Sequence, residues 1–289
     1  MKFEFIQAHQ DQFPVHRMCS VLEVSASGYY AWQARPLSGR AQANRKLVTE
    51  IRDIHAQSRQ TYGSPRVYAE LMARGFSASK NRVARLMRKE NIHSRRTKKR
   101  KVTTDSRHSY PIAPNLLQRD FQAASPNEKW LGDITFIPTG EGWLYLAAIL
   151  DLFSRKVIGW AMDETLESVL VEQAFQMAVQ NRKLVEGLLH HTDRGSQYAS
   201  GSYQNLLTAF DIQVSMSRTG DCFDNAPMES FFSTLKCEQV HLQNYSTRAE
   251  ARTDIFAYIE GFYNRTRRHS SLGYLSPEEF ERRYYQNLS

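Results

Sequence analysis

The fold is indicated most directly by residues 130–137, WLGDITFI, which alternate between two faces with the period of a β-strand. One face takes Trp130, Ile134 and Phe136, and the other takes Leu131, Thr135 and Ile137 together with Asp133. A carboxylate inside such a strand costs free energy unless it is paired or bound to a metal ion. Asp133 is therefore the first candidate functional residue, and an acid facing a sheet edge is the ordinary alternative.

The segments that follow predict the rest of a sheet. Their pattern indicates strands at 143–150 and 156–162, a helix at 166–181, strands at 187–192 and 212–216, and helices at 225–237 and 247–263. Short turns join the first three strands, which should therefore be antiparallel. We expect an α/β fold of the ribonuclease-H-like type. In that fold three antiparallel and two parallel strands form a mixed sheet flanked by helices, with the first strand beside the fourth.

The amino-terminal part of the chain is predicted to be helical. A short helical pair is expected over 14–34 and a long helix over 41–58, followed by helices at 64–75 and 79–91 that a tight turn connects. The last helix is cationic and carries Lys80, Arg82, Arg85, Arg88 and Lys89. This pattern predicts an all-α helix-turn-helix-like domain that binds DNA. A basic, solvated helix of a small bundle explains it equally well.

The charge distribution supports a division of the chain. Residues 1–128 hold 23 Lys and Arg against 10 Asp and Glu, whereas residues 129–289 hold 15 against 20. A basic run that should not pack marks the boundary, with Arg95, Arg96, Lys98, Lys99, Arg100 and Lys101. We predict a helical segment at 1–40, a basic helix-turn-helix-like domain at 41–93, a linker at 94–126 and a catalytic core with a helical extension at 127–289. Ordinary surface variation is the alternative to a DNA-binding half.

Composition excludes several classes of protein. No stretch approaches the roughly 18 apolar residues of a membrane helix, and the start lacks the apolar core of a signal peptide. The three cysteines are far apart and lack the CxxC spacing of a zinc site, so they read as reduced structural thiols. We expect a cytoplasmic protein without a membrane partner.

Two further acids stand in contexts that suit metal-dependent phosphoryl transfer. Asp193 follows an apolar strand and precedes a glycine turn, and Glu229 lies in the first turn of a helix with Lys236 two turns later on the same face. Two Mg²⁺ ions about 4 Å apart can serve both ends of an in-line displacement, and Mg²⁺ prefers oxygen ligands. Lys236 could then neutralise a phosphate, although an ordinary helix-surface pair also explains it. His191 reads more readily as a hydrogen-bonded core histidine.

The order of these residues resembles the transposase and retroviral-integrase superfamily. Asp133 and Asp193 are followed by Glu229 after 35 intervening residues, and by Lys236 seven residues later. The surrounding motifs are similar to those of bacterial insertion-sequence transposases encoded by two overlapping reading frames. They are YGSPRV at 62–67, WLGDIT at 130–135, DLFSR at 151–155, GW at 159–160, HTDRGSQY at 191–198, Asp224-Asn225-Ala226, YNRTRRH at 263–269, LGY at 272–274 and SP at 276–277.

The resemblance implies a transposase that cleaves and joins the inverted-repeat ends of an insertion sequence. It implies that Asp133, Asp193 and Glu229 hold two Mg²⁺ ions, which Mn²⁺ could replace, and that the enzyme acts on double-stranded DNA as a homodimer or larger assembly. Possible DNA contacts are Lys236, Arg194, the basic residues of the helical domain and linker, Arg267 and His269. A solvated helix end explains Arg267, Arg268 and His269 almost as well.

Two alternatives stay open at this point. The chain looks like a second-frame product, because residues 1–60 lack the sustained heptads expected of an upstream zipper. It could then act mainly as a DNA-binding or regulatory protein, with the upstream-frame product as a candidate partner. A different nuclease or integrase of the same fold is the second alternative. Asp151, Asp221 and Asp224 are expected to be structural, as turn or cap residues.

Overall fold

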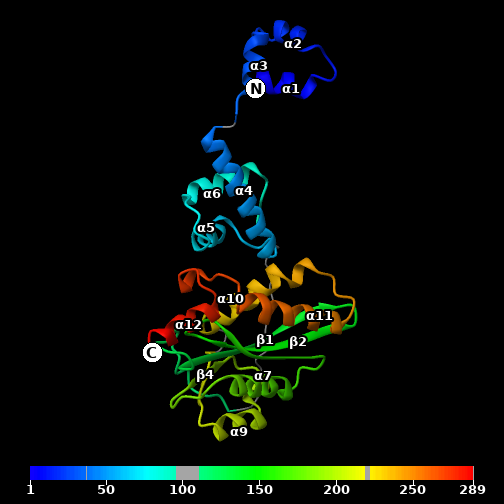
Figure 1. The fold of residues 1–289 in the computed structure, drawn as a ribbon. Helices are drawn as coiled ribbons and strands as arrows, with labels where there is room; N and C mark the ends of the chain where they lie inside the picture. Colours follow the sequence, from blue (N-terminus) through cyan, green and yellow to red (C-terminus); the bar gives the residue numbers. More distant parts are fainter. Residues whose placement is uncertain (37, 96–110, 219–221, 289) are drawn as a thin grey trace.

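The computed structural model describes residues 1–36, 38–95, 111–218 and 222–288, with the backbone only at 222–223 (Figure 1). The first three helices are α1 Lys2–His9, α2 Val15–Val21 and α3 Ala26–Ala34. They enclose a small core around Ile6, Met18, Cys19 and Tyr29. The predicted pair at 14–34 is confirmed by α2 and α3, whereas α1 was not anticipated because its apolar residues form no clear stripe.

The next three helices form the basic domain. They are α4 Gly39–Gln57, α5 Ser64–Ala73 and α6 Lys80–Lys89. Helix α4 buries Leu47, Ile51 and Ile54, as its spacing predicts. Ser79 caps α6 by accepting the backbone N–H of Arg82. Gly63 is the N-cap of α5, and Pro65 lies in the first turn, where its missing N–H costs no hydrogen bond.

A five-stranded sheet forms the centre of the larger domain. Its strands are β1 Lys129–Thr139, β2 Gly142–Asp151, β3 Val157–Asp163, β4 Leu189–Thr192 and β5 Gln213–Met216. They lie in the order β3-β2-β1-β4-β5, with β1–β2 and β2–β3 antiparallel and β1–β4 and β4–β5 parallel. The predicted mixed sheet, with the first strand beside the fourth, is confirmed.

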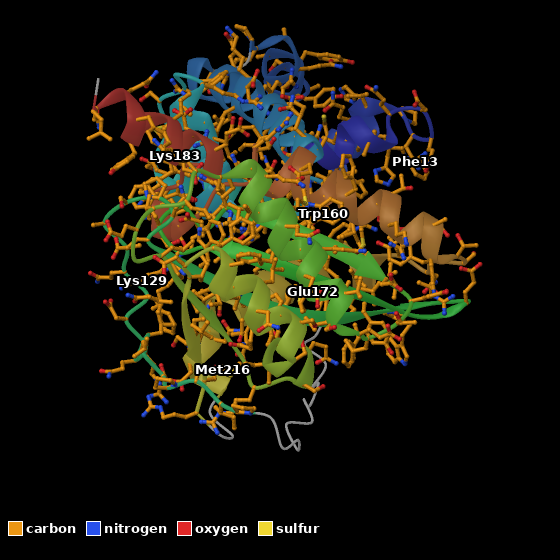
Figure 2. All side chains as sticks on the ribbon, turned by 90° about the horizontal axis from the view of Figure 1, so that it is seen from below. Phe13, Lys129, Trp160, Glu172, Lys183 and Met216 are labelled. Carbon is orange, nitrogen blue, oxygen red and sulfur yellow. The ribbon has the colours of Figure 1, made fainter. Side chains whose placement is uncertain are left out.

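Helices cover both faces of this sheet. The face of Trp130 packs against α7 Ser168–Asn181, α8 Ser196–Ala199 and α9 Gly201–Ala209. The face of Leu131 packs against α10 Ala226–Glu238 and α11 Arg248–Phe256. Figure 1 shows α10 and α11 above the sheet with α7 and α9 beneath it, and Figure 2 shows α7 lying across the strands in the view from below. The two faces therefore divide as the alternation of 130–137 predicts.

The basic domain docks onto the core through polar contacts beside shared apolar packing. The Tyr62 hydroxyl accepts the backbone N–H of Arg268 at 2.8 Å and donates to the Thr266 carbonyl at 3.2 Å. Arg66 Nε donates to the Arg268 carbonyl at 2.9 Å, and the Arg268 guanidinium pairs with Glu70. Buried residues of α4–α6 belong to the same apolar cluster as the Leu131 face of the sheet.

The segment that was expected to be a solvated linker packs on the core over its described part. Leu117 is buried, and the backbone N–H groups of Leu116 and Leu117 donate to Ser215 Oγ at 2.9 and 3.2 Å. The expectation was wrong for residues 111–126 because irregular backbone can still be satisfied by a side chain of β5. The basic residues from Arg96 to Lys101 lie outside the described residues.

Short helical elements complete the core. They are the 3₁₀ turns η1 Cys222–Asn225, η2 Val240–Leu242 and η4 Ser270–Leu272, the π-helix η3 Ala257–Tyr263 and helix α12 Pro277–Gln286. The continuous helix predicted for 247–263 thus changes to π geometry after Phe256, where Tyr258, Phe262 and Tyr263 are all buried. Among the described helices, none is both long and apolar enough to cross a membrane.

Candidate functional site

Two of the three predicted acids lie on adjacent strands. Asp133 is in the middle of β1, opposite Ala148 of β2, and β1 pairs in parallel with β4 so that Leu131 faces His191. Continuing this register by two residues brings Asp133 beside Asp193, at the carboxyl end of β4. Asp133 Oδ1 accepts the N–H of Ile134 and Asp193 Oδ1 accepts that of Gly195, each at 2.8 Å. Both side chains are partly buried.

The third acid approaches from helix α10. Glu229 lies in the first turn of α10 and is exposed, and Lys236 lies in the last turn. Asn225, the N-cap residue, donates its side-chain amide to the Gly132 carbonyl at 3.2 Å. This bond attaches the start of α10 to β1 next to Asp133.

The electrostatics of Asp133 show that the four side chains share one environment. Burial raises the pKa of Asp133 well above its usual value, and the negative charges of Asp193 and Glu229 raise it further. The Ile134 N–H and the Lys236 ammonium act in the opposite direction. Burial lowers the pKa of Lys236, and Asp133 opposes that shift. In the described part of the chain, however, no three acidic, histidine or cysteine side chains converge as a preformed metal site.

Close packing behind the acids explains the glycine of WLGDIT. A Cβ on Gly132 would meet His190 Cε1 at 3.0 Å and Thr192 Cγ2 at 3.2 Å. His190 is buried and its Nε2 lies 2.8 Å from the Tyr203 hydroxyl. A larger residue here would force these side chains to shift by a few tenths of an ångström. Tyr198, which sequence reasoning did not single out, is also buried here, and burial followed by the charge of Asp133 raises its pKa. Its place in HTDRGSQY is the signal that could have found it.

The residues expected to be structural are structural where they are described. His191 is buried, and its two ring nitrogens lie 2.8 Å from Ser215 Oγ and 3.1 Å from Ser217 Oγ. Asp151 is fully buried and accepts the N–H of Asn127 at 2.7 Å. Asp224 is buried in η1 and pairs with Arg119 and Arg218. Asp221 lies outside the described residues.

The predicted DNA contacts divide into three groups. The exposed ones are Lys80, Arg85, Arg88 and Arg95. Arg82 and Arg194 are partly buried, with Arg82 Nε donating to Asn44 at 3.0 Å and Arg194 Nε to the Ser217 carbonyl at 2.5 Å. The third group, Arg96 to Lys101, lies outside the described residues. Lys236 is the cation whose charge acts on Asp133, and Arg194 directly follows Asp193 in the chain.

Arg267 and His269 do not form the solvated helix end that their sequence suggests. Arg267 is only 5% exposed, and its Nε and Nη2 each donate to a Glu238 oxygen at 2.7 Å. His269 is 8% exposed and packs edge-on against the ring of Tyr263. The solvated helix end is wrong for these two residues, because Glu238 lies 29 residues before Arg267 in the chain and only folding brings the two together. Both side chains line an internal cavity.

Known proteins resemble this chain over nearly its whole length. Models described as "Integrase core domain" match residues 123–222 and 210–277, and one described as "HTH-like domain" matches residues 42–100. The chain is 43% identical over 283 residues to "Transposase InsF for insertion sequence IS3A" of Escherichia coli (strain K12), covering 97% of this chain and 98% of the relative. It is 42% identical over 269 residues to the "Insertion element IS600 uncharacterized 31 kDa protein" of Shigella sonnei, covering 93% of this chain and 99% of that one.

Among solved structures, the chain is similar to an intasome of simian T-cell lymphotropic virus, with a TM-score of 0.47, 14% identity and coverage of 79% of this chain and 73% of that one. It is also similar to the HTLV-2 integrase catalytic core domain in complex with magnesium, with a TM-score of 0.40, 18% identity and coverage of 55% and 99%.

Proposed function

We propose that this chain, which belongs to the family of InsF transposases of IS3-type insertion sequences, cleaves and joins DNA strands at the inverted-repeat ends of its insertion sequence. The observation that carries the proposal is that Asp193, Glu229 and Lys236 all lie near enough to Asp133 for their charges to shift its pKa. Three acids held this close repel one another, and a divalent cation would relieve that repulsion.

The donor set fits Mg²⁺ or Mn²⁺. Asp133, Asp193 and Glu229 would be the ligands, because all three offer carboxylate oxygens, and one oxygen of Asp133 and one of Asp193 is already oriented by a backbone N–H. Exposed Glu229 can approach by rotation of its side chain. When bound, two such ions supply activation of the attacking oxygen and stabilisation of the leaving oxygen in phosphoryl transfer.

The remaining residues position the DNA. Lys236 places a positive charge near Asp133, where it can neutralise a phosphate at the reacting position. The exposed cations of α6 offer a second, separate contact to the phosphate backbone. Simultaneous handling of two ends requires a dimer or a larger assembly, and the upstream-frame product is a possible partner.

A purely DNA-binding or regulatory role is the second candidate, because the α4–α6 domain alone could provide it. The acids argue against it. A regulator gains nothing from three mutually repelling carboxylates, which destabilise the fold that holds them.

The test is an assay with labelled inverted-repeat duplex, Mg²⁺ or Mn²⁺, and the chain either alone or fused to its upstream frame. Wild-type protein should cut and join the DNA. Asp133→Asn should lower the rate by roughly three orders of magnitude, which corresponds to about 4 kcal/mol of barrier, and leave DNA affinity nearly unchanged. Absence of cleavage by every form of the wild type would remove the enzymatic proposal, and unchanged activity of Asp133→Asn would remove that residue from the site.

A further inference from the structure

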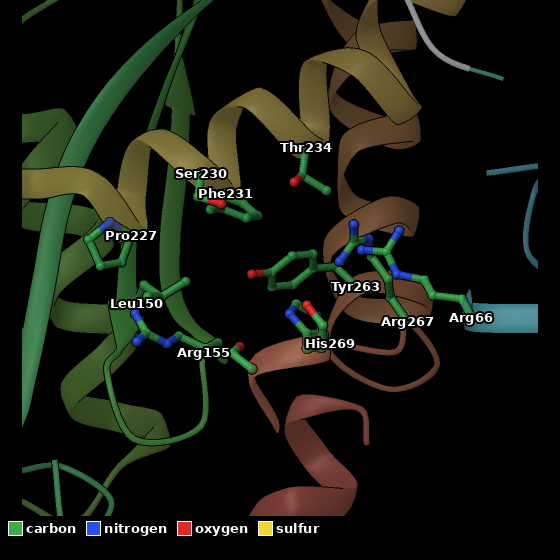
Figure 3. A pocket seen from close by; sticks show the side chains of 12 residues that line it. Arg66, Leu150, Arg155, Pro227, Ser230, Phe231, Thr234, Tyr263, Arg267 and His269 are labelled. Atoms are coloured by element: carbon green, nitrogen blue, oxygen red, sulfur yellow. The ribbon is translucent and has the colours of Figure 1, made fainter. Parts of the chain in front are cut away.

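A cavity of about 280 Å³ lies where the basic domain meets the core. Its twelve lining residues come from α5, the end of β2 and the β2–β3 turn, α10, and the segment from Tyr263 of η3 to Ser271 of η4. Three of these twelve are arginines and none is an Asp or a Glu. Figure 3 shows Arg155 at one end and Arg66 with Arg267 at the other, with Tyr263 and His269 between them.

The three arginines differ in how they are compensated. Arg267 is paired with Glu238 at 2.7 Å, and Arg66 lies 3.8 Å from the same carboxylate. Arg155 forms no ion pair with any described residue, and its Nη2 donates to the Phe121 carbonyl at 3.3 Å. Burial lowers its pKa. The charge of Asp151 offsets part of the cost of burying this guanidinium, but Asp151 forms no ion pair with it, and an anion in the cavity would complete the compensation.

The backbone holds Arg155 in this position at a cost. Its φ of 60° is left-handed, a conformation that residues other than glycine seldom adopt. Asp151 fixes the turn, because its Oδ1 accepts the N–H groups of Phe153 at 2.8 Å and Ser154 at 3.3 Å, and its carbonyl accepts that of Arg155 at 2.8 Å. This accounts for the motif DLFSR, which the proposed catalytic site does not use, and strain of this kind collects at functional sites.

A second, independent observation comes from His269. Its imidazole hydrogen-bonds the backbone of Tyr263, but Nε2 is buried and has no partner among the described residues. A buried, unsatisfied nitrogen in the wall of a polar cavity calls for a partner that enters the cavity. The hydroxyl groups of Ser230, Thr234 and Tyr263 line the same space.

The cavity is close to the candidate catalytic acids. Leu150 forms part of its wall, and β2 pairs with β1 so that Leu131 faces Leu150 while Asp133 faces Ala148. Asp133 and Leu150 are therefore diagonal neighbours on one face of an antiparallel pair, about 7–8 Å apart. Ser230 immediately follows Glu229 in α10. The cavity is therefore within reach of a DNA strand whose reacting phosphate lies at the acids.

We propose that this cavity binds a phosphate of the DNA backbone, together with part of its nucleotide, next to the reacting phosphate. Arg155 is the principal ligand of the phosphate, and the hydroxyl groups of Ser230 and Thr234 donate to it. Because the His269 imidazole donates to the Tyr263 carbonyl and burial keeps it neutral, its Nε2 is an acceptor and takes a hydrogen bond from the nucleotide part. The assignment rests on the proposed function, since it takes its ligand from the DNA at the acids. The volume approaches the roughly 300 Å³ of small ligand pockets and exceeds what one water molecule of about 30 Å³ requires.

The experiment uses the full chain and dye-labelled inverted-repeat duplex in EDTA, so that binding is measured without cleavage. Neutral methylphosphonates replace single phosphates near the end, one position at a time in each strand. For the wild type, one position should weaken binding roughly tenfold, the value of one charge-assisted hydrogen bond. In Arg155→Gln the affinity for unmodified DNA should fall by a similar factor, and the methylphosphonate at that position should cause no further loss of affinity, which we call its penalty. Arg155→Lys should keep most of the affinity and most of the penalty.

Matched variants separate a lost contact from a lost fold. Arg283→Gln removes one charge from an exposed arginine of α12 and should leave affinity and every penalty unchanged. If Arg155→Gln does not fold, Thr234→Val tests the α10 wall and should reduce the penalty at the same position. Penalties that persist in Arg155→Gln at every position would overturn the proposal. The proposal would also be overturned if the His269 ring nitrogens responded to inorganic phosphate or deoxyadenosine monophosphate but not to the duplex, because the cavity would then be a site for free anions. If the wild type shows these binding effects but does not cleave the duplex in Mg²⁺, the result would count against the proposed function and not against the phosphate site.

Discussion

At the scale of single residues, local sequence singles out two of the candidate acids but gives no sign of how the cations are paired. Asp133 is conspicuous because it interrupts an apolar alternation, and Asp193 because it ends a strand before a glycine. Arg267 carried no such signal, since its partner Glu238 is on another helix. Glu229 became a site residue through the order of the motifs, and the bond from Asn225 to Gly132 that positions its helix could not be seen from sequence.

The buried histidines behind the acids predict a pH dependence of stability. Burial lowers the pKa of His190 to about 3 and that of His191 to about 4. Below pH 6.5 the unfolded chain takes up protons that the folded chain refuses, so stability falls as the pH falls, by about 1.4 kcal/mol per pH unit for each histidine. Asp151, with its pKa raised to about 6, opposes this between pH 6 and 4.

Urea denaturation at pH 7.5 and 5.5 measures this effect. His190→Gln should show a smaller loss of unfolding free energy between the two pH values than the wild type. His16→Gln alters an exposed histidine and should leave the loss unchanged. Equal losses for wild type and His190→Gln would mean that His190 does not resist protonation in the folded chain.

At the scale of elements, periodicity and apolar runs predicted the strands, and the succession of strands and helices along the chain predicted the order of the sheet. It could not predict the π-helical turn of η3, where three aromatic side chains are buried together and the backbone widens to accommodate them. It also could not show how closely α7 lies on β3. A Cβ on Gly159 would meet the Ala174 carbonyl oxygen at 2.2 Å and Ala178 N at 2.7 Å.

Gly159→Ala should therefore be strongly destabilising. The neighbouring atoms belong to the backbone of α7 and cannot move aside without shifting the helix, so a loss of several kcal/mol is expected, above the roughly 1–3 kcal/mol typical of core overpacking. Thermal unfolding followed by circular dichroism gives the measurement. Gly39→Ala, where nothing lies within 4 Å of the added Cβ, serves as the control and should change the midpoint little. A Gly159→Ala midpoint near that of the wild type would refute this account of GW.

At the scale of the whole molecule, the charge division predicted two functional halves but not their attachment. The linker was expected to separate them, yet Tyr62 and Arg66 of the basic domain bond the backbone of residues 266–268 in the core. These contacts depend on carbonyl and N–H groups, which leave no trace in side-chain patterns. They also explain why YGSPRV and YNRTRRH occur together.

Tyr62→Phe should loosen this attachment. It removes a hydroxyl that makes two hydrogen bonds and leaves the N–H of Arg268 without its partner, a cost of about 1–3 kcal/mol. Hydrogen exchange should become faster at residues 58–63 and 264–269, while exchange in β1 and β2 stays unchanged. Tyr30→Phe, in the first helical segment, is the control and should not alter exchange at either site. Unchanged protection in Tyr62→Phe would show that apolar packing alone holds the domains.

The central claim is that three carboxylates carry the DNA strand chemistry, and parallel single-turnover kinetics on labelled inverted-repeat DNA test it most directly. Asp193→Asn and Glu229→Gln are compared with Asp211→Asn and Glu186→Gln, which make the same chemical changes at exposed positions. The account predicts that the first two variants lose strand cleavage and joining by about 10³-fold while binding DNA, and that both controls match the wild type. Wild-type rates in Asp193→Asn or Glu229→Gln would contradict it.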